Sequence, residues 1–238
     1  MPTPETVRVT LSRPTIDAAL IGELHEALDL AERSPDCRMV VLQGSDGTFS
    51  TGMDFAEAVS DGNRDGAGFF ALLRRFTTVP RVVVSIVDGQ VAAGGVGLVA
   101  ASDLVYASSR STFALPEALW GLLPCAVLPF LIRRVGFQPA YAMTLSTLPL
   151  SAAEAAACHL VDTVADQPTA PLRRLTYRLT KLDGSVIGEM KRYAGRLWPV
   201  SDDVQRLAVD EFARLVGSPA VQRRMADFAT HRRMPWER

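Results

Sequence analysis

A run of β-branched residues followed closely by a run of small residues constrains the fold of this chain most strongly. Residues 81–87 have the sequence Arg-Val-Val-Val-Ser-Ile-Val, which is typical of a strand buried on both faces. An Asp88-Gly89 turn follows, and residues 92–101 then combine alanine, glycine, valine and leucine as an apolar helix would. Because buried strands and helices pack in layers, this pattern predicts an α/β architecture.

Other segments continue this alternation through about the first 150 residues. Apolar residues at helical spacing predict helices at residues 16–32 and 69–76. Alternating or continuous apolar residues predict four further strands, at residues 7–11, 39–42, 104–107 and 112–115.

The last third of the chain has a helical pattern instead. Ser151 and Glu154 have the spacing of a capping box, which predicts the start of an alanine-rich helix. Serine, aspartate and proline signals predict two more helices, at residues 201–215 and 218–231.

The charge and cysteine content exclude several classes of protein. The formal net charge is -1, so the chain has no overall basic field for nucleic acid. Cys37, Cys125 and Cys158 are widely spaced, which favours a reducing compartment over a disulfide framework. The sequence shows neither a signal-peptide pattern nor an apolar stretch of membrane-spanning length. We therefore expect a cytoplasmic protein that contacts neither nucleic acid nor membrane and binds no metal.

Two glycine-containing segments could carry chemistry. Residues 49–55 are Phe-Ser-Thr-Gly-Met-Asp-Phe, and residues 89–97 are Gly-Gln-Val-Ala-Ala-Gly-Gly-Val-Gly. Taken singly, each segment could simply form a turn. The second segment lacks the glycine order of a dinucleotide-binding fold and the lysine of a phosphate-binding loop. It does place small residues around Gly94 at the start of a helix, where free N–H groups could face an oxygen atom.

These segments, together with Pro116-Glu117, resemble the crotonase, or enoyl-CoA hydratase, superfamily. In that family one amide follows the glycine of an F-x-x-G-x-D segment and another belongs to a G-G loop, and the matching residues are Met53 and Gly94. The resemblance implies that these two amides form an oxyanion hole for a thioester carbonyl and that Glu117 is the catalytic glutamate. Four further residues are expected to contact the substrate: Asp54, Gly95, Gly97 and Trp120.

The fold implied by the resemblance is a spiral of ββα units with a helical C-terminal region for trimerisation. The spiral core would occupy residues 1–165, and residues 166–238 would mediate oligomerisation and cover the active site. The resemblance also implies a homotrimer or a hexamer. No cofactor is expected, because the acyl group would be carried on the phosphopantetheine of an acyl carrier protein or of coenzyme A.

One position departs from the family pattern. Enoyl-CoA hydratases have a second glutamate a few residues after the G-G pair, and Gly97 occupies that position here. A hydration mechanism that uses two carboxylates is therefore disfavoured.

Two segments are similar to the crotonase-like dehydratases of polyketide β-branching cassettes, namely residues 115–136 and Pro235-Trp236-Glu237. Those enzymes remove water from 3-hydroxy-3-methylglutaryl-acyl carrier protein and produce 3-methylglutaconyl-acyl carrier protein. A sister group decarboxylates that product and generally lacks the glutamate, so Glu117 favours the dehydratase. The alternatives are the decarboxylase, a hydratase or isomerase acting on a CoA thioester, and an inactive scaffold.

A single carboxylate could carry out the dehydration if the C2 proton and the hydroxyl leave from the same face of the substrate. Glu117 would remove the C2 proton and then protonate the departing hydroxyl. The amides of Met53 and Gly94 would stabilise the enolate oxygen. Apolar neighbours such as Leu115 and Leu119 would raise the pKa of Glu117.

Several residues have two interpretations from the sequence. Asp54 could be a second polar group of the site, or it could hold its own loop. Cys125 could be a nucleophile or a wall of the pocket, and Trp120 could pack in the core. Arg133-Arg134 could attract a phosphate or an acidic carrier protein, or lie on a solvated helix face.

Overall fold

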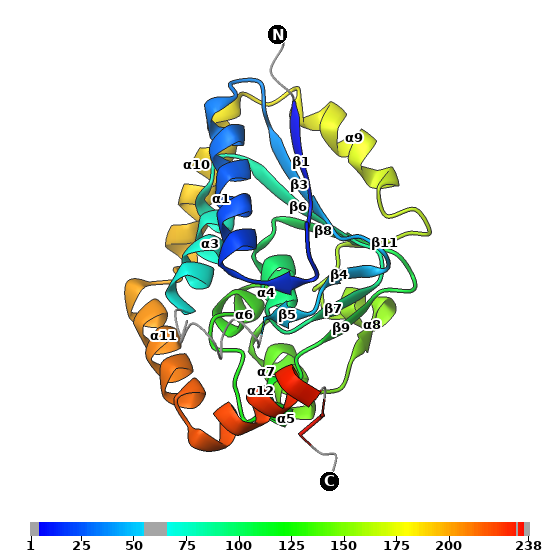
Figure 1. The fold of residues 1–238 in the computed structure, drawn as a ribbon. Helices are drawn as coiled ribbons and strands as arrows, with labels where there is room; N and C mark the ends of the chain where they lie inside the picture. Colours follow the sequence, from blue (N-terminus) through cyan, green and yellow to red (C-terminus); the bar gives the residue numbers. More distant parts are fainter. Residues whose placement is uncertain (1–4, 55–65, 232, 236–238) are drawn as a thin grey trace.

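The computed structural model describes residues 5–54, 66–231 and 233–235, and it has an α/β fold in which helices surround mostly parallel sheets (Figure 1). Phe55 of the first glycine-containing segment lies outside the described residues, as do Trp236 and Glu237.

The larger sheet has five parallel strands in the order β1-β3-β6-β8-β11. Its strands are β1 (Thr6–Thr10), β3 (Met39–Gln43), β6 (Val82–Val87), β8 (Leu104–Ala107) and β11 (Thr163–Val164). Helices cover both faces, which explains why β3 and β6 are almost continuously apolar.

The smaller sheet has the order β10-β9-β7-β4, and a two-stranded sheet pairs β2 with β5. The strands are β4 (Thr48–Ser50), β7 (Gln90–Ala92), β9 (Thr112–Ala114), β10 (Leu150–Ser151), β2 (Thr15–Ile16) and β5 (Gly52–Met53). From β3 onward, three successive turns of the chain place one strand in the larger sheet, a later strand in the smaller sheet, and then a helix: β3, β4 and α3 (Gly66–Thr78); β6, β7 and α4 (Gly94–Ala101); β8, β9 and α5 (Glu117–Trp120). This repeat is the predicted spiral of ββα units.

Seven helices of the described chain accompany the strands up to residue 157. They are α1 (Ala18–Arg33), α3 (Gly66–Thr78), α4 (Gly94–Ala101), α5 (Glu117–Trp120), α6 (Leu128–Val135), α7 (Phe137–Ser146) and α8 (Ala152–Ala157). The predicted capping box of α8 is confirmed, because Ser151 and Glu154 each bond the backbone of the other.

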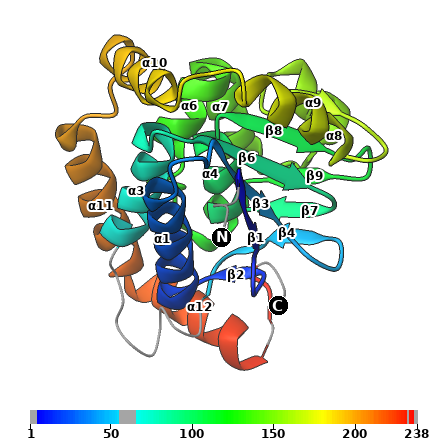
Figure 2. The same ribbon diagram turned by 90° about the horizontal axis from the view of Figure 1, so that it is seen from above.

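The C-terminal third is helical, as predicted. It contains α9 (Ala170–Leu179), α10 (Gly184–Leu197), α11 (Asp202–Val216) and α12 (Pro219–His231). Helices α10 and α11 pack against α3 (Figure 2), and α12 packs against α5. The division of function at residue 165 and the trimerisation role of these helices stay predictions.

The predicted start of the first helix was wrong by two residues. The Asp17 side chain accepts a hydrogen bond of 2.7 Å from the Leu20 N–H, so α1 begins at Ala18. Ile16 belongs instead to β2, where it pairs with Met53.

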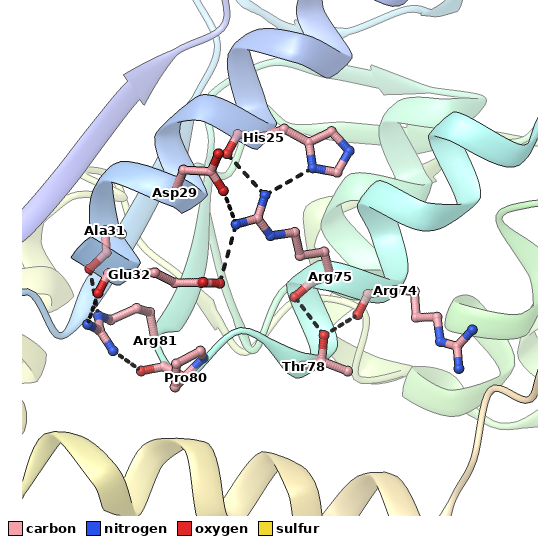
Figure 3. A network of polar contacts seen from close by, with 9 residues as sticks. All are labelled: His25, Asp29, Ala31, Glu32, Arg74, Arg75, Thr78, Pro80 and Arg81. Carbon is pink, nitrogen blue, oxygen red and sulfur yellow. Dashed lines mark hydrogen bonds and ion pairs between the residues drawn. The ribbon is translucent and has the colours of Figure 1, made fainter. Parts of the chain in front are cut away.

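A polar network, here called the α1–α3 network, joins α1 to α3 and to the segment that follows α3 (Figure 3). Arg75 contacts the carboxylates of Asp29 and Glu32 and the backbone oxygen of His25. Arg81 donates to the backbone oxygens of Ala31, Glu32 and Ser34 at 2.9, 3.1 and 3.2 Å. Because these carbonyls terminate α1, the Arg81 side chain caps that helix.

None of the helices in the described ranges is long and apolar enough to cross a membrane. Within those same ranges, no group of three His, Cys, Asp or Glu residues is arranged to hold a metal ion.

Candidate active site

Three neighbouring parallel strands of the smaller sheet each lead into one of the predicted catalytic residues. Strand β7 lies between β4 and β9 and runs parallel to both. Met53 follows β4, Gly94 follows β7, and Glu117 follows β9. Because carboxyl ends of parallel strands share one edge of a sheet, the fold brings these three residues to the same edge. Each of the three residues is partly exposed.

The segments that carry the two predicted oxyanion amides are in contact. A methyl group added to Gly52 would lie 3.2 Å from the Gly94 nitrogen. Asp54 donates its N–H to the Ile16 oxygen on β2 at 3.2 Å. Since successive N–H groups of a strand point to opposite sides, the Met53 N–H points away from β2.

The amide of Gly94 is the first of helix α4, and it lies at the positive end of the helix. Two nearby N–H groups already have acceptors. The Ala93 N–H donates to the Ala114 oxygen and the Val96 N–H donates to the Ala93 oxygen, both at 2.9 Å. In the described part of the chain, no residue accepts a hydrogen bond from Gly94 N–H. This amide can therefore donate to a ligand.

Glu117 is the titratable group of the site. Its Oε2 atom is buried and has no hydrogen-bond partner among the described residues. Burial raises the pKa of Glu117 from 4.5 to about 7, and a hydrogen bond from its own backbone N–H opposes the shift. A carboxyl group with a pKa near 7 can both accept and return a proton at neutral pH, as a general acid–base catalyst must.

Apolar side chains fill the space next to Gly97 into which a side chain at this position would extend. A methyl group added there would lie 3.1 Å from Leu73 Cδ1, 3.1 Å from Val127 Cγ2 and 3.4 Å from Phe69 Cζ. Gly97 is itself buried in α4. A second carboxylate could enter only if these neighbours shifted, so the structure gives Glu117 no carboxylate partner from this position.

Gly95 and Asp54 have structural contacts at this edge of the sheet. A methyl group on Gly95 would lie 2.8 Å from Ser50 Cβ and 2.9 Å from the Ser50 oxygen, so only glycine lets α4 approach β4. The Asp54 carboxylate accepts a hydrogen bond of 3.3 Å from Thr15 Oγ1. This contact fits the interpretation that Asp54 holds its loop, and substrate contact by either residue stays a prediction.

Trp120 anchors α12 over α5. Its ring packs edge-on against Phe228 with 5.0 Å between centroids, and its backbone oxygen accepts a hydrogen bond of 3.1 Å from Arg224. Trp120 is only 7% exposed. The structure therefore favours packing over the predicted substrate contact.

Cys125 lines an apolar groove of about 360 Å³ between α6 and α11, together with Leu128, Ile132 and Leu207. Burial, aided by the negative charges of Glu211 and Glu117, raises the pKa of the Cys125 thiol to about 11. The thiol is therefore protonated near neutral pH, which disfavours the nucleophile interpretation and fits a pocket wall.

Arg134 fits neither of its sequence interpretations. It donates to the backbone oxygens of Leu160 and Ser102 at 2.9 and 2.8 Å, and it pairs with Asp162 at 2.5 Å. Its side chain is 9% exposed. Arg134 is thus a buried tie between α6 and the strand ends, because three partners hold its guanidinium.

Sequence reasoning missed two residues that shape the site. Ser50 Oγ accepts a hydrogen bond from the Gly52 N–H at 3.2 Å and donates to the Pro14 oxygen at 2.9 Å. Ala93 has a positive φ of 50°, which is uncommon for a residue with a side chain. Neither role has a local signal, because each depends on a segment distant in sequence.

Comparison with known proteins agrees with this geometry. The model of the enoyl-CoA hydratase/isomerase family matches residues 4–183. The bacillaene synthase dehydratase PksH of Bacillus subtilis is 33% identical over 96% of this chain and 92% of its own length. A mevalonyl-coenzyme A hydratase of Beauveria bassiana is 30% identical over 85% of this chain and 73% of its own length.

A solved structure has the same fold. The crystal structure of PksH from Bacillus subtilis, a polyketide biosynthesis enoyl-CoA hydratase, superposes with a TM-score of 0.89 at 32% identity. The match covers 95% of this chain and 94% of PksH. On this family match and these relatives, the chain is an enoyl-CoA hydratase-like hydro-lyase and belongs to the enoyl-CoA hydratase/isomerase, or crotonase, family.

Proposed function

We propose that this enzyme removes water from 3-hydroxy-3-methylglutaryl-acyl carrier protein and produces 3-methylglutaconyl-acyl carrier protein in polyketide β-branching. The observation that carries the proposal is the Glu117 carboxyl group, which is buried, unpartnered at Oε2 and raised in pKa to about 7. It follows the strand next to the one that leads into Gly94.

The reaction needs one proton acceptor and one proton donor. Glu117 takes the proton from C2, and the negative charge that develops on the thioester oxygen is stabilised by the amides of Met53 and Gly94, at about 3–4 kcal/mol for each donor. The electron pair then forms the C2–C3 double bond as the C3–oxygen bond breaks. The hydroxyl leaves as water with the proton held by Glu117, which returns the carboxylate to its starting state.

The apolar packing around Gly97 supports this one-carboxylate chemistry. A hydratase of the two-carboxylate type needs a second acidic side chain there, and Phe69, Leu73 and Val127 occupy the space. A retained glutamate at position 117 also disfavours the decarboxylase alternative.

The names of two relatives support the substrate class. PksH is a dehydratase of bacillaene synthase, which is a polyketide system. The mevalonyl group of the Beauveria bassiana enzyme's substrate carries both a hydroxyl and a methyl on C3, as the proposed substrate does. That enzyme acts on a coenzyme A thioester, so it also keeps open the alternative that this chain processes a CoA substrate.

We also propose that the enzyme assembles as a homotrimer or as a pair of trimers. Helix α7 and the residues just after it expose apolar side chains, with Phe137 and Leu145 in the helix at 63% and 68% exposure and Leu148 beyond its end at 65%. The end of α10 and the start of α11 expose a second apolar area around Trp198 and Leu207. Two different apolar areas on one chain suit a cyclic assembly in which unlike surfaces meet. Light scattering that gives a stable monomer at micromolar concentration would contradict this assembly.

The activity is tested by intact-mass analysis of the loaded carrier protein. Incubation with 3-hydroxy-3-methylglutaryl-acyl carrier protein should give loss of water, and incubation with 3-methylglutaconyl-acyl carrier protein should give no loss of carbon dioxide. The same acyl group on coenzyme A should be processed with a lower kcat/KM, because remote contacts with the carrier protein help to position the reacting carbon. Equal values of kcat/KM for the two donors would assign the enzyme to CoA metabolism instead.

A further inference from the structure

Ala93 has a backbone conformation that a residue with a side chain rarely adopts. Its φ is 50° and its ψ is -124°, and it directly precedes Gly94 at the start of α4. Such a conformation costs free energy and persists only when the surrounding contacts impose it. Residues of this kind are frequent at sites where a precise geometry matters, so the contacts of Ala93 are informative.

Both backbone groups of Ala93 are held in place. Its N–H donates to the Ala114 oxygen on β9, and its oxygen accepts a hydrogen bond from the Val96 N–H in α4, both at 2.9 Å. The strand pairing of Ala92 with Ala114 fixes the residue before it. The peptide that contains the Gly94 amide is thus clamped between the smaller sheet and α4.

The methyl group of Ala93 lies against the other amide-bearing segment. A methyl group built on Gly52 would lie only 2.5 Å from the Ala93 Cβ atom. Gly52 is buried, has a φ of +91° and directly precedes Met53. The Ala93 side chain therefore occupies the space above the Gly52 backbone and keeps the two segments at a fixed separation.

We propose that Ala93 is a positioning residue, whose methyl group sets the spacing between the Met53 and Gly94 amides and whose strained backbone directs the Gly94 N–H toward the substrate oxygen. This inference rests on the proposed oxyanion role of the two amides. It assigns Ala93 no contact with the substrate, because its effect acts through Gly52 and Gly94.

The inference makes stability and turnover respond in opposite directions. Glycine adopts a positive φ without strain, so Ala93→Gly should leave the folded protein at least as stable as the wild type. It also removes the methyl spacer and loosens the amide pair, and small displacements of catalytic groups can lower rates by about 100-fold. A residue with a purely structural role would not separate the two properties in this way.

The experiment compares Ala93→Gly with the wild type and with Thr147→Gly. Thr147 also has a positive φ, of 57°, but it ends α7. It lies outside the edge of the smaller sheet that holds Met53, Gly94 and Glu117, here called the catalytic edge. For Ala93→Gly we expect kcat to fall by about 10- to 100-fold with a nearly unchanged KM and an unchanged or higher Tm. Exchange of the C2 proton with deuterated solvent should fall by the same factor. Thr147→Gly should keep the wild-type kcat and should not lower Tm.

Ala93→Ser is the conservative variant that tests the spacer directly, because serine keeps the Cβ atom that separates the two segments. It should retain most of the wild-type kcat. The inference is overturned if Ala93→Gly keeps the wild-type kcat, or if kcat and Tm fall together. The proposed function fails separately, if the wild-type enzyme neither dehydrates the acyl carrier protein substrate nor exchanges its C2 proton.

Discussion

Two polar regions of the molecule differ in whether their charged groups have hydrogen-bond partners. In the α1–α3 network, Arg75 has two carboxylates and a backbone oxygen as partners (Figure 3). Arg81 caps the end of α1 through three carbonyls. At the catalytic edge of the smaller sheet, Glu117 Oε2 is the one carboxyl oxygen of the described chain that is buried without a partner.

The difference shows what each region does. A buried polar group without a partner destabilises the fold, so partners are normally supplied wherever the group serves stability. Glu117 keeps its unfavourable setting, and that setting raises its pKa into the range useful for proton transfer. The network therefore stabilises the fold, whereas in the proposed mechanism the setting of Glu117 costs stability and provides a group for proton transfer.

The largest effect is expected at the catalytic edge. Glu117→Gln keeps the side-chain volume but cannot accept the C2 proton, so dehydration should fall by about 10²–10⁴-fold. Mass analysis of the loaded carrier protein measures water loss, and deuterium incorporation at C2 measures proton removal. Loss of both supports a single carboxylate that acts as base and acid.

A matched variant, Asp54→Asn, tests the other acidic residue of this edge. It should keep most of the activity, because the Asp54 carboxylate is bonded to Thr15. Near wild-type dehydration by Glu117→Gln together with an inactive Asp54→Asn would transfer the catalytic role to Asp54.

The next effect is expected in the α1–α3 network, and it concerns stability alone. Arg81→Met retains the apolar part of the side chain but removes the charged donor to the oxygens of Ala31 and Ser34. These oxygens would keep only their bonds from the Ser34 and Cys37 N–H groups. We expect the free energy of unfolding to fall by about 2–3 kcal/mol, measured by chemical denaturation. The kcat of the remaining folded enzyme should be unchanged. A lower kcat at normal stability would show that this region is coupled to the active site.

A third effect links pH to both properties of Glu117. Its pKa is 4.5 when unperturbed and about 7 in the folded enzyme, so between these pH values the folded state holds a proton that the unfolded state has lost. The free energy of unfolding should therefore decrease as pH rises through this window, by at most about 3 kcal/mol. Over the same window kcat/KM should increase, because the base must be ionised.

Glu117→Gln is the control for this pH effect. Subtracting its unfolding profile from that of the wild type removes contributions from other titrating groups. A difference that is flat from pH 4 to 8 would show that Glu117 has an ordinary pKa, and the comparison between the two regions would lose its basis.

The smallest effect is expected at the exposed margin of the network. Asp29 pairs with Arg75, but its side chain is 46% exposed and Glu32 lies beside it as a second partner. Asp29→Asn should lower the free energy of unfolding by much less than Arg81→Met does and leave kcat unchanged. A loss of stability as large as that of Arg81→Met would show that the network acts as one cooperative unit.

Much of the secondary structure was predictable because its signals are local. The capping box at Ser151 and the strand at residues 82–87 follow directly from the residue types. The start of α1 was less certain from the pattern, because Ile16 continues the apolar spacing of the helix. Only its pairing with Met53 places Ile16 in a strand.

The motif residues also gave a correct family, and through it the fold. Their individual roles were harder to predict, since the same residue type serves different purposes in different surroundings. Trp120 packs against Phe228, and Arg134 ties α6 to Asp162, although each could equally have lain at a binding surface. These partners are more than 25 residues distant in sequence, so no local pattern reports them.

The sequence by itself determined which chemical groups are present: the glutamate of the Pro116-Glu117 pair, two small-residue segments, and a glycine where a second carboxylate could have stood. The tertiary structure alone decided what those groups can do. Alignment of β4, β7 and β9 brings the segments to one edge, burial raises the pKa of Glu117, and hydrogen bonds to Ala114 and Val96 hold the backbone of Ala93, whose φ is positive. The physical reason is that desolvation and backbone strain arise from atoms packed around a residue, and those atoms come from distant parts of the chain.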